Sequence, residues 1–529
     1  MVTEKLPGTP QGTARAGAIL RAGGVAAIPT ETVYGLAANA LDPEAVRKIF
    51  AAKGRPADNP LIVHIASLDQ WPPLVREIPK AARKLAEAFW PGPLTIILEK
   101  SDRIPMETSG GLDTVGVRCP AHPLARAVIQ AAGVPLAAPS ANLSGRPSPT
   151  TFAHAWEDLE GRVDAVLDGG DCGVGVESTV VSLTGDRARV LRPGGVTVDS
   201  IRGVLGPVEL DPAVTAMLVP GQKAASPGMK YKHYAPKAEL AVLDGSPEAF
   251  ARFVNAREPE TAALCFSETE PLLARPALCL GSRYDGAEQA RRLFEVLHRL
   301  DLLGVKRAYA QMPNRRGVGL AVYNRLLRAA AFRVEPLPGP RVVGLVGPSG
   351  AGKSTVAQGL APMGFSLVDC DRLTRSPQVY NPDCLRALGR AFGEDLVSGG
   401  VLDRRGLAER AFRDQASRKL LGEITFPHIE RAVRREIAGS RGTVLLDAPT
   451  LFESGLDSLC GRILTVTAPE KVRLERVMAR DGLTKAQAME RFQAQYPAEF
   501  YEARGDFVLE NTGDISRLLE EAARELKGG

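Results

Sequence analysis

Hydrophobic and polar residues alternate in short blocks along the chain, and the length of each block predicts a strand or a helix. In the first 200 residues, apolar runs predict strands over 25–28, 61–65, 94–98 and 114–117. Longer mixed stretches between them predict helices over 43–52 and 79–89. Short strands that alternate with helices are typical of an α/β domain, so residues 1–200 are predicted to form one.

Proline and glycine mark the borders of two further blocks. Residues 201–237 include the run S-P-G-M-K-Y-K-H-Y-A-P and are predicted to be a linker. Residues 238–335 are predicted to be a small Rossmann-like α/β domain, with strands and a closing helix over 238–243, 261–266, 276–280, 308–310 and 321–331. The Pro-rich stretch 336–340 is predicted to be a stiff second linker before the third block, 341–529.

The third block opens with the nine residues G-P-S-G-A-G-K-S-T, which lie between an apolar run and a helix-compatible segment. This setting is typical of a P-loop, whose backbone N–H groups surround phosphate oxygens. Lys353 would reach the outer phosphates, and the Ser354 hydroxyl would hold Mg²⁺. The residues predicted to bind this nucleoside triphosphate are Gly347, Gly350, Ala351, Gly352, Lys353, Ser354 and Thr355.

Length and composition narrow the class of protein. The chain has 529 residues, which exceeds what one core organises, and its 44% hydrophobic and 24% charged content is that of a globular protein. A net charge of +5 is too small to indicate nucleic-acid binding by itself. We find no signal-peptide pattern and no apolar run of membrane-spanning length, and the seven cysteines form no C-x-x-C pair. We therefore expect a cytoplasmic protein with reduced thiols and no membrane partner.

Two polar clusters stand out in the first block. Lys53 and Arg55 are one residue apart and could bracket a triphosphate, whereas Ser140 and Asn142 lie in a Pro-flanked turn. From the residues alone, a solvated helix end and an Asx-type turn explain these pairs equally well. His64 ends an apolar strand and by itself indicates a core histidine.

Taken together, P-T-E-T-V-Y-G-L (29–36), K-G-R and S-A-N resemble the YrdC-like threonylcarbamoyl-AMP synthase family. The 226–236 run and V-Y-N-R-L (322–326) resemble its long form, which has an extra C-terminal α/β domain. The resemblance implies that ATP, L-threonine and bicarbonate condense to threonylcarbamoyl-AMP and pyrophosphate. The product would pass to the machinery that modifies adenosine in certain tRNAs, with weak or indirect tRNA association.

The same resemblance assigns individual residues. Lys53 and Arg55 would be the catalytic cations, and the ATP-binding set would be Lys53, Arg55, Asn59, Ser140, Asn142, Ser178 and Arg192. The threonine side would be lined by Thr30, Tyr34, His64, Arg118 and Thr179. Tyr231 in the linker would close over the site as a lid. The competing class is a non-catalytic RNA-binding module.

Carboxylates and arginines in the third block add candidate chemistry. Asp369 and Asp371 end a predicted strand over 364–371 and would share one face of it, one as a base and the other ordering Mg²⁺ or water. A helix N-cap at Asp371 is an equally good interpretation. Arg473, Arg476 and Arg480 recur at helical spacing, which fits either a lid helix or a solvated face.

The P-loop, V-D-C-D (368–371), P-T-L-F-E (449–453), R-D-G-L-T (480–484), Gln495 and D-F-V-L-E-N (506–511) together resemble the dephospho-CoA kinase family. The resemblance implies transfer of the ATP γ-phosphoryl group to the ribose 3′-hydroxyl of dephospho-CoA. Asp371 would be the base, Lys353 and Arg480 the catalytic cations, and Phe452 would line the acceptor pocket with Asp371. Phe426 and Gly505 depart from the family pattern, which has histidine and alanine there.

The sequence as a whole therefore predicts a fusion of two ATP-dependent enzymes. One alternative is that a single half catalyses while the other is an RNA-binding or regulatory relic. Another is that the third block phosphorylates a different small molecule or a nucleoside monophosphate.

Overall fold

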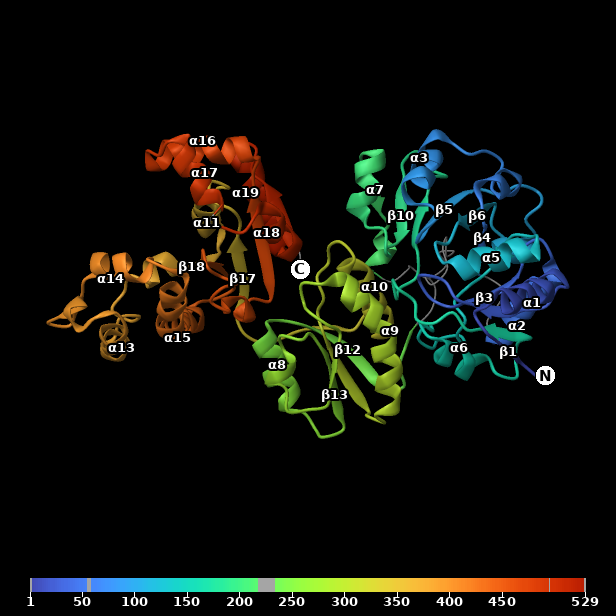
Figure 1. The fold of residues 1–529 in the computed structure, drawn as a ribbon, viewed down its shortest axis with the longest axis horizontal. Coiled ribbons are helices and arrows are strands. Elements are labelled where there is room, and N and C mark those ends of the chain that lie inside the picture. Colours follow the sequence, from blue (N-terminus) through green and yellow to red (C-terminus); the bar gives the residue numbers. More distant parts are fainter. Residues whose placement is uncertain (1, 55–58, 217–233, 494, 528–529) are drawn as a thin grey trace. The chain divides into compact units, whose positions relative to one another are not determined.

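The computed structural model describes residues 2–54, 59–216, 234–493 and 495–527. Contacts divide the chain into two compact units. Unit 1 comprises Met1–Leu243 and Phe253–Glu335, and unit 2 comprises Asp244–Arg252 and Pro336–Gly529. The predicted α/β multidomain fold is confirmed: the described residues form an eleven-stranded sheet, two five-stranded sheets and a two-stranded pair (Figure 1).

The eleven-stranded sheet of unit 1 has the order β1-β8-β2-β3-β7-β4-β6-β5-β9-β10-β11. Parallel and antiparallel pairs are mixed: β4 runs parallel to β6, whereas β5 runs antiparallel to it. Its strands are β1 (Glu4–Leu6), β2 (Ala26–Ile28), β3 (Gly35–Asn39), β4 (Ile62–His64), β5 (Leu94–Glu99), β6 (Thr114–Arg118), β7 (Leu136–Ala137), β8 (Ala165–Leu167), β9 (Thr179–Ser182), β10 (Arg189–Arg192) and β11 (Glu209–Leu210).

Local signals explain where the helices of this part begin and end. Asp42 caps α2 by accepting from the Glu44 N–H, and α2 ends at Gly54, whose φ of 60° is left-handed. Thr9 caps α1 in the same way. The helices are α1 (Pro10–Arg21), α2 (Pro43–Lys53), α3 (Lys80–Phe89), α4 (Met106–Ser109), α5 (Pro123–Ala132), α6 (Phe152–Leu159) and α7 (Val198–Leu205). The first part of the predicted linker thus holds the end of α7, β11 and a 3₁₀ turn at Pro212–Val214.

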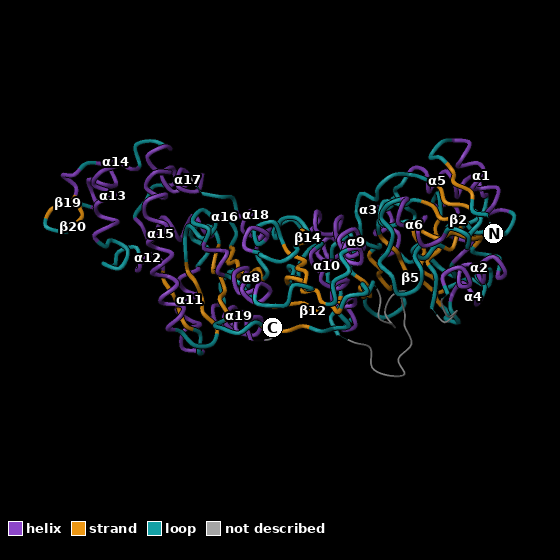
Figure 2. The backbone as a smooth tube through the Cα atoms, turned by 90° about the horizontal axis from the view of Figure 1, so that it is seen from below, coloured by secondary structure: helices purple, strands orange, loops and turns teal. Residues whose placement is uncertain are grey.

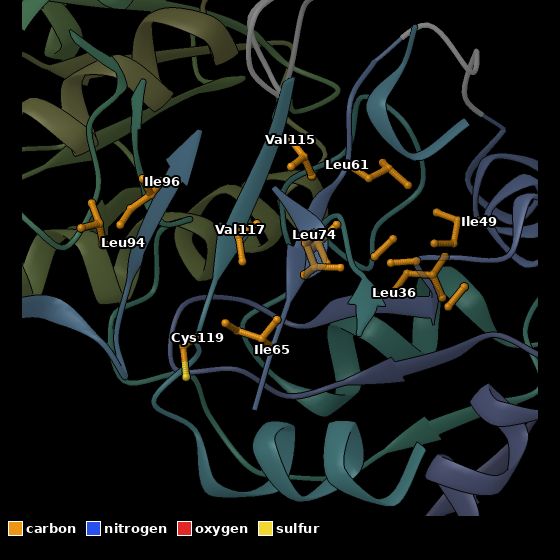
Figure 3. Packing of buried hydrophobic residues seen from close by; sticks show 14 of the residues in the cluster. Leu36, Ile49, Leu61, Ile65, Leu74, Leu94, Ile96, Val115, Val117 and Cys119 are labelled. Atoms are coloured by element: carbon orange, nitrogen blue, oxygen red, sulfur yellow. The ribbon is translucent and has the colours of Figure 1, made fainter. Parts of the chain in front are cut away.

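Helices cover both faces of the central strands of this sheet. In β2, Ala27 packs into a core that includes Val46 and Ile49 of α2, whereas Ala26 and Ile28 pack into a second core with α1 and α5. Figure 3 shows the larger core, where Ile49 lies beside Leu36 of β3. Because successive strand residues face opposite sides, burial on both faces makes β2 continuously apolar.

The second sheet of unit 1 has the order β14-β13-β15-β12-β16, and the pairs β13–β14, β13–β15 and β12–β15 are parallel. Leu293, Leu297 and Leu300 of α9 pack on Leu240 and Leu264. Figure 1 shows α9 and α10 together beside β12. The elements are β12 (Glu239–Asp244), α8 (Pro247–Asn255), β13 (Thr261–Cys265), β14 (Ala277–Cys279), α9 (Gly286–Leu302), β15 (Arg307–Gln311), α10 (Gly319–Ala329) and β16 (Val334–Pro336).

Unit 2 is built on a parallel sheet with the order β18-β21-β17-β22-β23. Val343 and Leu345 of β17 pack with α11 and α19 on one face, whereas Val342 and Val346 pack with α15 on the other. The strands are β17 (Arg341–Val346), β18 (Ser366–Asp369), β21 (Thr443–Asp447), β22 (Arg462–Thr467) and β23 (Phe507–Glu510).

The helices of unit 2 follow these strands and also form a small side group. Figure 2 shows α13, α14 and the pair β19 (Val397–Ser398) and β20 (Val401–Leu402) lying together, around a core that includes Leu388 and Leu407. The helices are α11 (Lys353–Leu360), α12 (Cys370–Leu373), α13 (Pro382–Phe392), α14 (Arg404–Ala411), α15 (Gln415–Gly439), α16 (Glu470–Asp481), α17 (Lys485–Gln493), α18 (Ala498–Arg504) and α19 (Ile515–Lys527).

Two properties concern the whole described chain. All seven cysteines are free thiols, six of them buried. Within the described ranges, every helix is too short or too polar to cross a membrane.

Candidate active sites

The first candidate site in unit 1 forms where α2 ends against the loop after β7. Lys53 is the last residue of α2 and is buried. Its Nζ donates to the carbonyl oxygens of Ser140 and Asn142, the latter at 2.6 Å. The Ser140 hydroxyl donates to Asn142 Oδ1 at 2.5 Å. The structure therefore brings Lys53, Ser140 and Asn142 together, although they are almost ninety residues apart in sequence.

A buried carboxylate holds this loop in shape. Asn142 Nδ2 donates to the carbonyl of Arg146, 2.8 Å away, and Asp158 Oδ2 accepts from the Leu143 N–H at 3.0 Å. Arg146 also pairs with Asp158. The aspartate comes from α6, the next helix along the chain, which thus fixes the small polar groups that face Lys53.

Asn59, which lies between α2 and β4 in the chain, is a buried amide. The residue is 1% exposed, and neither its Oδ1 nor its Nδ2 has a partner among the described residues. A buried amide without partners is costly, so its two polar atoms are available for a ligand. Arg55 and Tyr231, which were assigned to ATP and to the lid, lie outside the described residues.

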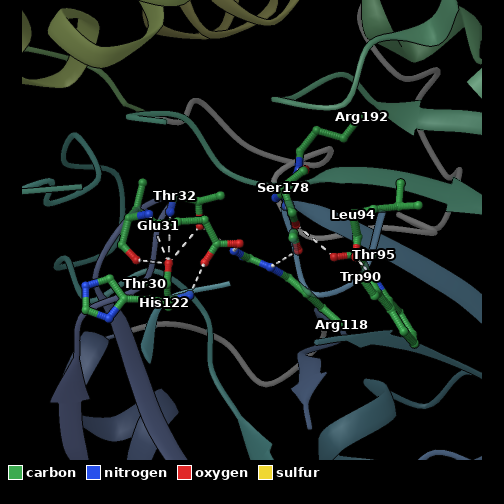
Figure 4. A network of polar contacts seen from close by, with 12 residues as sticks. Thr30, Glu31, Thr32, Trp90, Leu94, Thr95, Arg118, His122, Ser178 and Arg192 are labelled. Atoms are coloured by element: carbon green, nitrogen blue, oxygen red, sulfur yellow. Dashed lines mark hydrogen bonds and ion pairs between the residues drawn. The ribbon is translucent and has the colours of Figure 1, made fainter. Parts of the chain in front are cut away.

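Arg118 is the centre of a second polar cluster (Figure 4). It ends β6 directly opposite His64 of β4. Its guanidinium donates to Glu31 Oε1 at 2.5 Å and to the Thr32 hydroxyl at 2.9 Å. Burial raises the pKa of Glu31, but the charge and hydrogen bond of Arg118, together with backbone N–H donors, lower it below its usual value. Arg118 is thus a buried cation held beside the P-T-E-T run.

The remaining residues assigned to threonine have internal partners. The Tyr34 hydroxyl donates to the Gly170 carbonyl at 2.8 Å, and the Thr179 hydroxyl donates to the Val196 carbonyl at 2.6 Å. The Thr30 hydroxyl donates to the Val33 carbonyl in a local turn. Complete burial lowers the pKa of His64 to about 3, so this histidine is neutral at physiological pH.

Ser178, just before β9, lies beside Arg192, the last residue of β10. Arg192 donates from Nε to the Ser178 carbonyl at 3.0 Å and from Nη2 to its hydroxyl at 3.1 Å. Burial lowers the pKa of Arg192 to about 10, with a further lowering by the Arg325 charge. Next to them, the Glu177 carboxylate pairs with Arg325 at 2.9 Å and accepts from Ser148 at 2.5 Å. Both arginines thus converge on the Glu177–Ser178 segment.

The second candidate site is the P-loop of unit 2. Gly347, Gly350 and Gly352 have φ values of 144°, 80° and 98°, which turn the backbone between β17 and α11. Lys353 Nζ donates to the Gly347 carbonyl at 2.7 Å. Ser354 and Thr355 are exposed in the first turn of α11, while Ala351 is buried. The backbone turn and the position of Lys353 are those of a phosphate-binding loop.

The predicted arrangement of two aspartates on one strand face is wrong. β18 ends at Asp369, whose side chain accepts from the Arg372 N–H at 3.0 Å and so caps α12. Asp371 lies in the first turn of that helix and is exposed. The alternative of a cap at Asp371 is also wrong, because the cap lies two residues earlier. A short polar side chain after a strand satisfies a free helix N–H, and this local bond ended the strand.

Asp447 joins the aspartates at the same edge of the sheet. It pairs with Asp369 on β18 and with Leu345 on β17, so it lies beside the strand that leads into the P-loop. Burial raises the pKa of Asp447 to about 6, although the Lys353 charge lowers it. Burial likewise lowers the pKa of Lys353, which Asp447 and Asp371 counteract. These groups therefore influence one another electrostatically.

The arginines of α16 do not form one uniform basic face. Arg473 is buried, donates to the Ala468 carbonyl and lies over the Phe492 ring. Arg476 donates to the Gly350 carbonyl of the P-loop at 3.3 Å. Arg480 is exposed and pairs with Asp481 at 2.7 Å. Each arginine has a different environment, which helical spacing alone did not indicate.

The structure shows the surroundings of the positions at which the third block departs from the kinase pattern, next to Phe426 and at Gly505. Pro427 lies inside α15, and His428 follows it with Nδ1 3.0 Å from Asn381 Nδ2, at the start of α13. A Cβ at Gly505 would lie 2.5 Å from the Thr465 hydroxyl, so this backbone approach favours glycine. Phe452 packs against the edge of Phe500, with ring centroids 5.5 Å apart.

Several residues of the two sites escaped the sequence analysis. Glu31, Thr32 and Glu177 stand within motifs that were recognised, but their side chains received no role. Asp158 belongs to none of the motifs, and Asn511 is only the final residue of D-F-V-L-E-N. Arg325 was noted only as a member of the run V-Y-N-R-L (322–326), and its side chain was given no role. Except for Asp158, whose partners are in the nearby loop, their partners lie far away in sequence, so spacing could not identify them.

Comparison with known proteins covers both parts. A family model described as "Telomere recombination" matches residues 18–194, and one for the threonylcarbamoyl-AMP synthase C-terminal domain matches 196–331. A dephospho-CoA kinase model matches residues 341–517.

Three individual proteins show the extent of the similarity. The threonylcarbamoyl-AMP synthase of Pyrococcus abyssi is 46% identical over 325 residues, which are 60% of this chain and 94% of that protein. The dephospho-CoA kinase of Anaeromyxobacter dehalogenans is 40% identical over 197 residues, 36% of this chain and 93% of that protein. The crystal structure of Pyrococcus abyssi Sua5 complexed with L-threonine has a TM-score of 0.59 and 42% identity, covering 64% of this chain and 100% of that one. Both resemblances inferred from the motifs are confirmed.

Proposed function

The chain belongs to the threonylcarbamoyl-AMP synthase family at residues 18–194 and 196–331, and to the dephospho-CoA kinase family at residues 341–517. We propose that it catalyses the reactions of both families, the synthesis of threonylcarbamoyl-AMP and the phosphorylation of dephospho-CoA. One observation carries the proposal. Each unit holds a lysine whose ammonium group donates to the carbonyls of a loop of small residues: the buried Lys53 at Ser140–Asn142 and the half-buried Lys353 at the P-loop. Each arrangement has the composition of a phosphate site.

In unit 1, the reaction is the condensation of L-threonine, bicarbonate and ATP to threonylcarbamoyl-AMP, pyrophosphate and water, the water being lost when the threonine amine and bicarbonate form the carbamate. We assign ATP to Lys53, Arg55, Asn59, Ser140, Asn142, Ser178 and Arg192. The carbamate of threonine attacks the α-phosphorus, and pyrophosphate leaves. Cations that face the α-phosphate and the leaving group neutralise charge that grows in the transition state. The proximity of Arg192 to Ser178 supports this assignment.

Arg118 is the group that we assign to the threonine carboxylate. Its pairing with Glu31 and Thr32 holds the guanidinium in a fixed direction, and a fixed cation loses little freedom on binding. The hydroxyls of Thr30, Tyr34 and Thr179 already donate to the backbone. We therefore assign these three residues and His64 to the wall of the threonine pocket.

The product determines the partners of unit 1. Threonylcarbamoyl-AMP is a mixed anhydride that hydrolyses in water, so it must pass quickly to an enzyme that transfers it to tRNA. We assign that transfer machinery as the partner, in the cytoplasm, and only weak or indirect contact with tRNA itself. The modest net charge of +5 supports this choice.

In unit 2, the reaction is transfer of the ATP γ-phosphoryl group to the 3′-hydroxyl of dephospho-CoA. Lys353 would exchange the Gly347 carbonyl for phosphate oxygens. Asp371, exposed in the first turn of α12, would accept the proton of the acceptor hydroxyl. Arg480 would swing from Asp481 to the phosphates, and Phe452 would contact the acceptor.

The donors around the P-loop fit Mg²⁺. The Ser354 hydroxyl is exposed at the start of α11, and the Asp447 carboxylate ends the strand beside β17. Hydroxyl and carboxylate oxygens are ligands that Mg²⁺ prefers, with phosphate and water completing its shell. We assign Ser354 and Asp447 to the ion, which when bound would neutralise the β- and γ-phosphate oxygens.

Product identification tests both assignments. With ATP, L-threonine and ¹³C-bicarbonate, the chain should release pyrophosphate and a nucleotide whose mass contains threonine and the label. With ATP and dephospho-CoA, it should yield ADP and coenzyme A. Absence of the labelled nucleotide would reject the synthase, and ADP formation that does not depend on dephospho-CoA would reject the kinase.

A further inference from the structure

The side chain of Asn511 contacts the P-loop, although the proposed kinase mechanism gives it no role. Asn511 follows β23, and its backbone N–H donates to the Thr467 carbonyl at 2.7 Å. Its side chain is buried and donates from Nδ2 to the Ala351 carbonyl at 2.9 Å. Asn511 therefore ties the middle of the P-loop to the edge of the parallel sheet.

The contact is so close that only glycine fits opposite it. A Cβ at Gly352 would lie 2.2 Å from Asn511 Nδ2, and the φ of Gly352 is 98°. No side chain other than hydrogen is compatible with both the conformation and the distance. The P-loop thus passes directly over the amide of Asn511.

Arg476 on α16 reinforces the same contact. Its Nη1 donates to the Gly350 carbonyl at 3.3 Å, and its Nη2 donates to the Asn511 carbonyl and to Asn511 Oδ1, both at 3.4 Å. These bonds are long and individually weak. Arg476 thus donates to the Gly350 carbonyl, Asn511 donates to the next carbonyl, that of Ala351, and the two side chains are bonded to each other.

The direction of these bonds explains what they do. A P-loop binds phosphate because its N–H groups point inward, which makes neighbouring carbonyls point outward. Part-buried carbonyls need partners, or the loop reorients to find them. Asn511 and Arg476 donate to the carbonyls of Ala351 and Gly350 from outside, and so favour the phosphate-binding conformation before ATP arrives.

We propose that Asn511 is a positioning residue for the donor nucleotide, which with Arg476 fixes the P-loop carbonyls so that the opposite N–H groups face the phosphates. The inference rests on the proposed kinase function of unit 2. Asn511 acts through the P-loop backbone, so its loss weakens ATP binding and phosphoryl transfer but leaves the acceptor untouched.

The test compares Asn511→Ala and Asn511→Leu with the parent, all in the full chain carrying Lys53→Ala so that the first ATP site contributes little. Leucine keeps the volume of asparagine but cannot donate. Asn255→Ala is the matched control, because Asn255 Nδ2 also donates to a carbonyl, that of Leu272, at 2.9 Å. ATP affinity is measured by calorimetry, melting temperature by circular dichroism, and the KM for dephospho-CoA by ADP release.

Both Asn511 variants should bind ATP about tenfold more weakly, since each loses a bond and leaves a buried carbonyl unsatisfied. The melting temperature should fall by only a few degrees. The KM for dephospho-CoA should stay close to that of the parent, and Asn255→Ala should bind ATP normally. Parent-like ATP affinity in Asn511→Leu would show that the side chain only fills space and would overturn the proposal. An equal loss in Asn255→Ala would overturn it as well.

The two hypotheses fail separately. If the chain without the Lys53 substitution makes no coenzyme A, the kinase assignment is wrong. The dependence of ATP affinity on Asn511 is measured without turnover, so its outcome decides the positioning role in either case. Should Asn511→Ala fail to fold, Asn511→Leu alone gives the decision.

Discussion

At the scale of single residues, Arg325 of unit 1 carries a fully buried charge, which needs a partner of opposite charge. The side chain is fully buried and pairs with Glu177 at 2.9 Å. Burial alone raises the pKa of Glu177, but the charges of Arg325 and Arg192 lower it to about 2. A buried ion pair of this kind adds little beyond a well-packed apolar pair, but removing one partner strands the other charge.

Replacing Arg325 with alanine should therefore destabilise unit 1 by about 3–5 kcal/mol. Chemical denaturation, followed by fluorescence, measures this change. Arg189→Ala is the matched control, because Arg189 pairs with Glu209 on the surface, where such pairs contribute about 0–1 kcal/mol. Equal effects of the two substitutions would contradict the account of Arg325. The double variant with Glu177→Gln should recover part of the loss.

Asp371 allows a test of catalysis at one position. Asp371→Asn should lower the kcat of coenzyme A formation by about 10²–10⁴-fold, because the amide cannot accept the acceptor proton. The KM for ATP should change little, since phosphate binding is assigned to the P-loop. Steady-state assays with varied ATP and dephospho-CoA separate the two constants. An unchanged kcat would remove Asp371 from the role of base.

At the scale of elements, apolar runs predicted the strands well and polar junctions less well. The run at 94–98 became β5 (Leu94–Glu99), and 114–117 became β6 (Thr114–Arg118), because strands that are buried on both faces are continuously apolar. The end of β18 was misplaced, because the capping bond of Asp369 is a local choice that periodicity does not encode. Similarly, motif matching selected Lys53, but only the fold shows which carbonyls it contacts.

Two helices of unit 1 meet at a pair of histidines. His154 of α6 stacks on His298 of α9, with ring centroids 4.0 Å apart. His154 Nδ1 and His298 Nε2 are buried without a partner among the described residues. Burial lowers the pKa of both, that of His298 to about 4, although Glu157 raises it. Burial therefore favours the neutral form of both rings in the folded protein.

This pair should make unit 1 sensitive to acid. The folded pKa of His298 lies below the ordinary 6.5, so its contribution is complete above about pH 6.5 and is lost as the pH falls toward 4. His298→Phe keeps a ring and removes the titration. Its free energy of unfolding should fall less steeply over that range, by up to about 3 kcal/mol at pH 4. Parallel curves for variant and parent would contradict this explanation.

At the scale of the whole molecule, the chain carries two separate sets of cores and two separate ATP sites. The cores around β2 and β12 belong to unit 1, and those on either face of β17 belong to unit 2. No residue assigned to one reaction was assigned to the other. Both reactions use ATP, yet neither product is a substrate of the other, so the account predicts independent catalysis.

The most direct test of this account measures both activities in two variants of the full chain. Lys353→Ala should lower the rate of coenzyme A formation by about 10²–10³-fold, because a preorganised phosphate cation stabilises the transition state by about 3–4 kcal/mol. It should leave threonine-dependent pyrophosphate release unchanged. Lys53→Ala should show the opposite pattern. Loss of both activities in either variant, or full synthase activity in Lys53→Ala, would contradict the assignment of two independent sites.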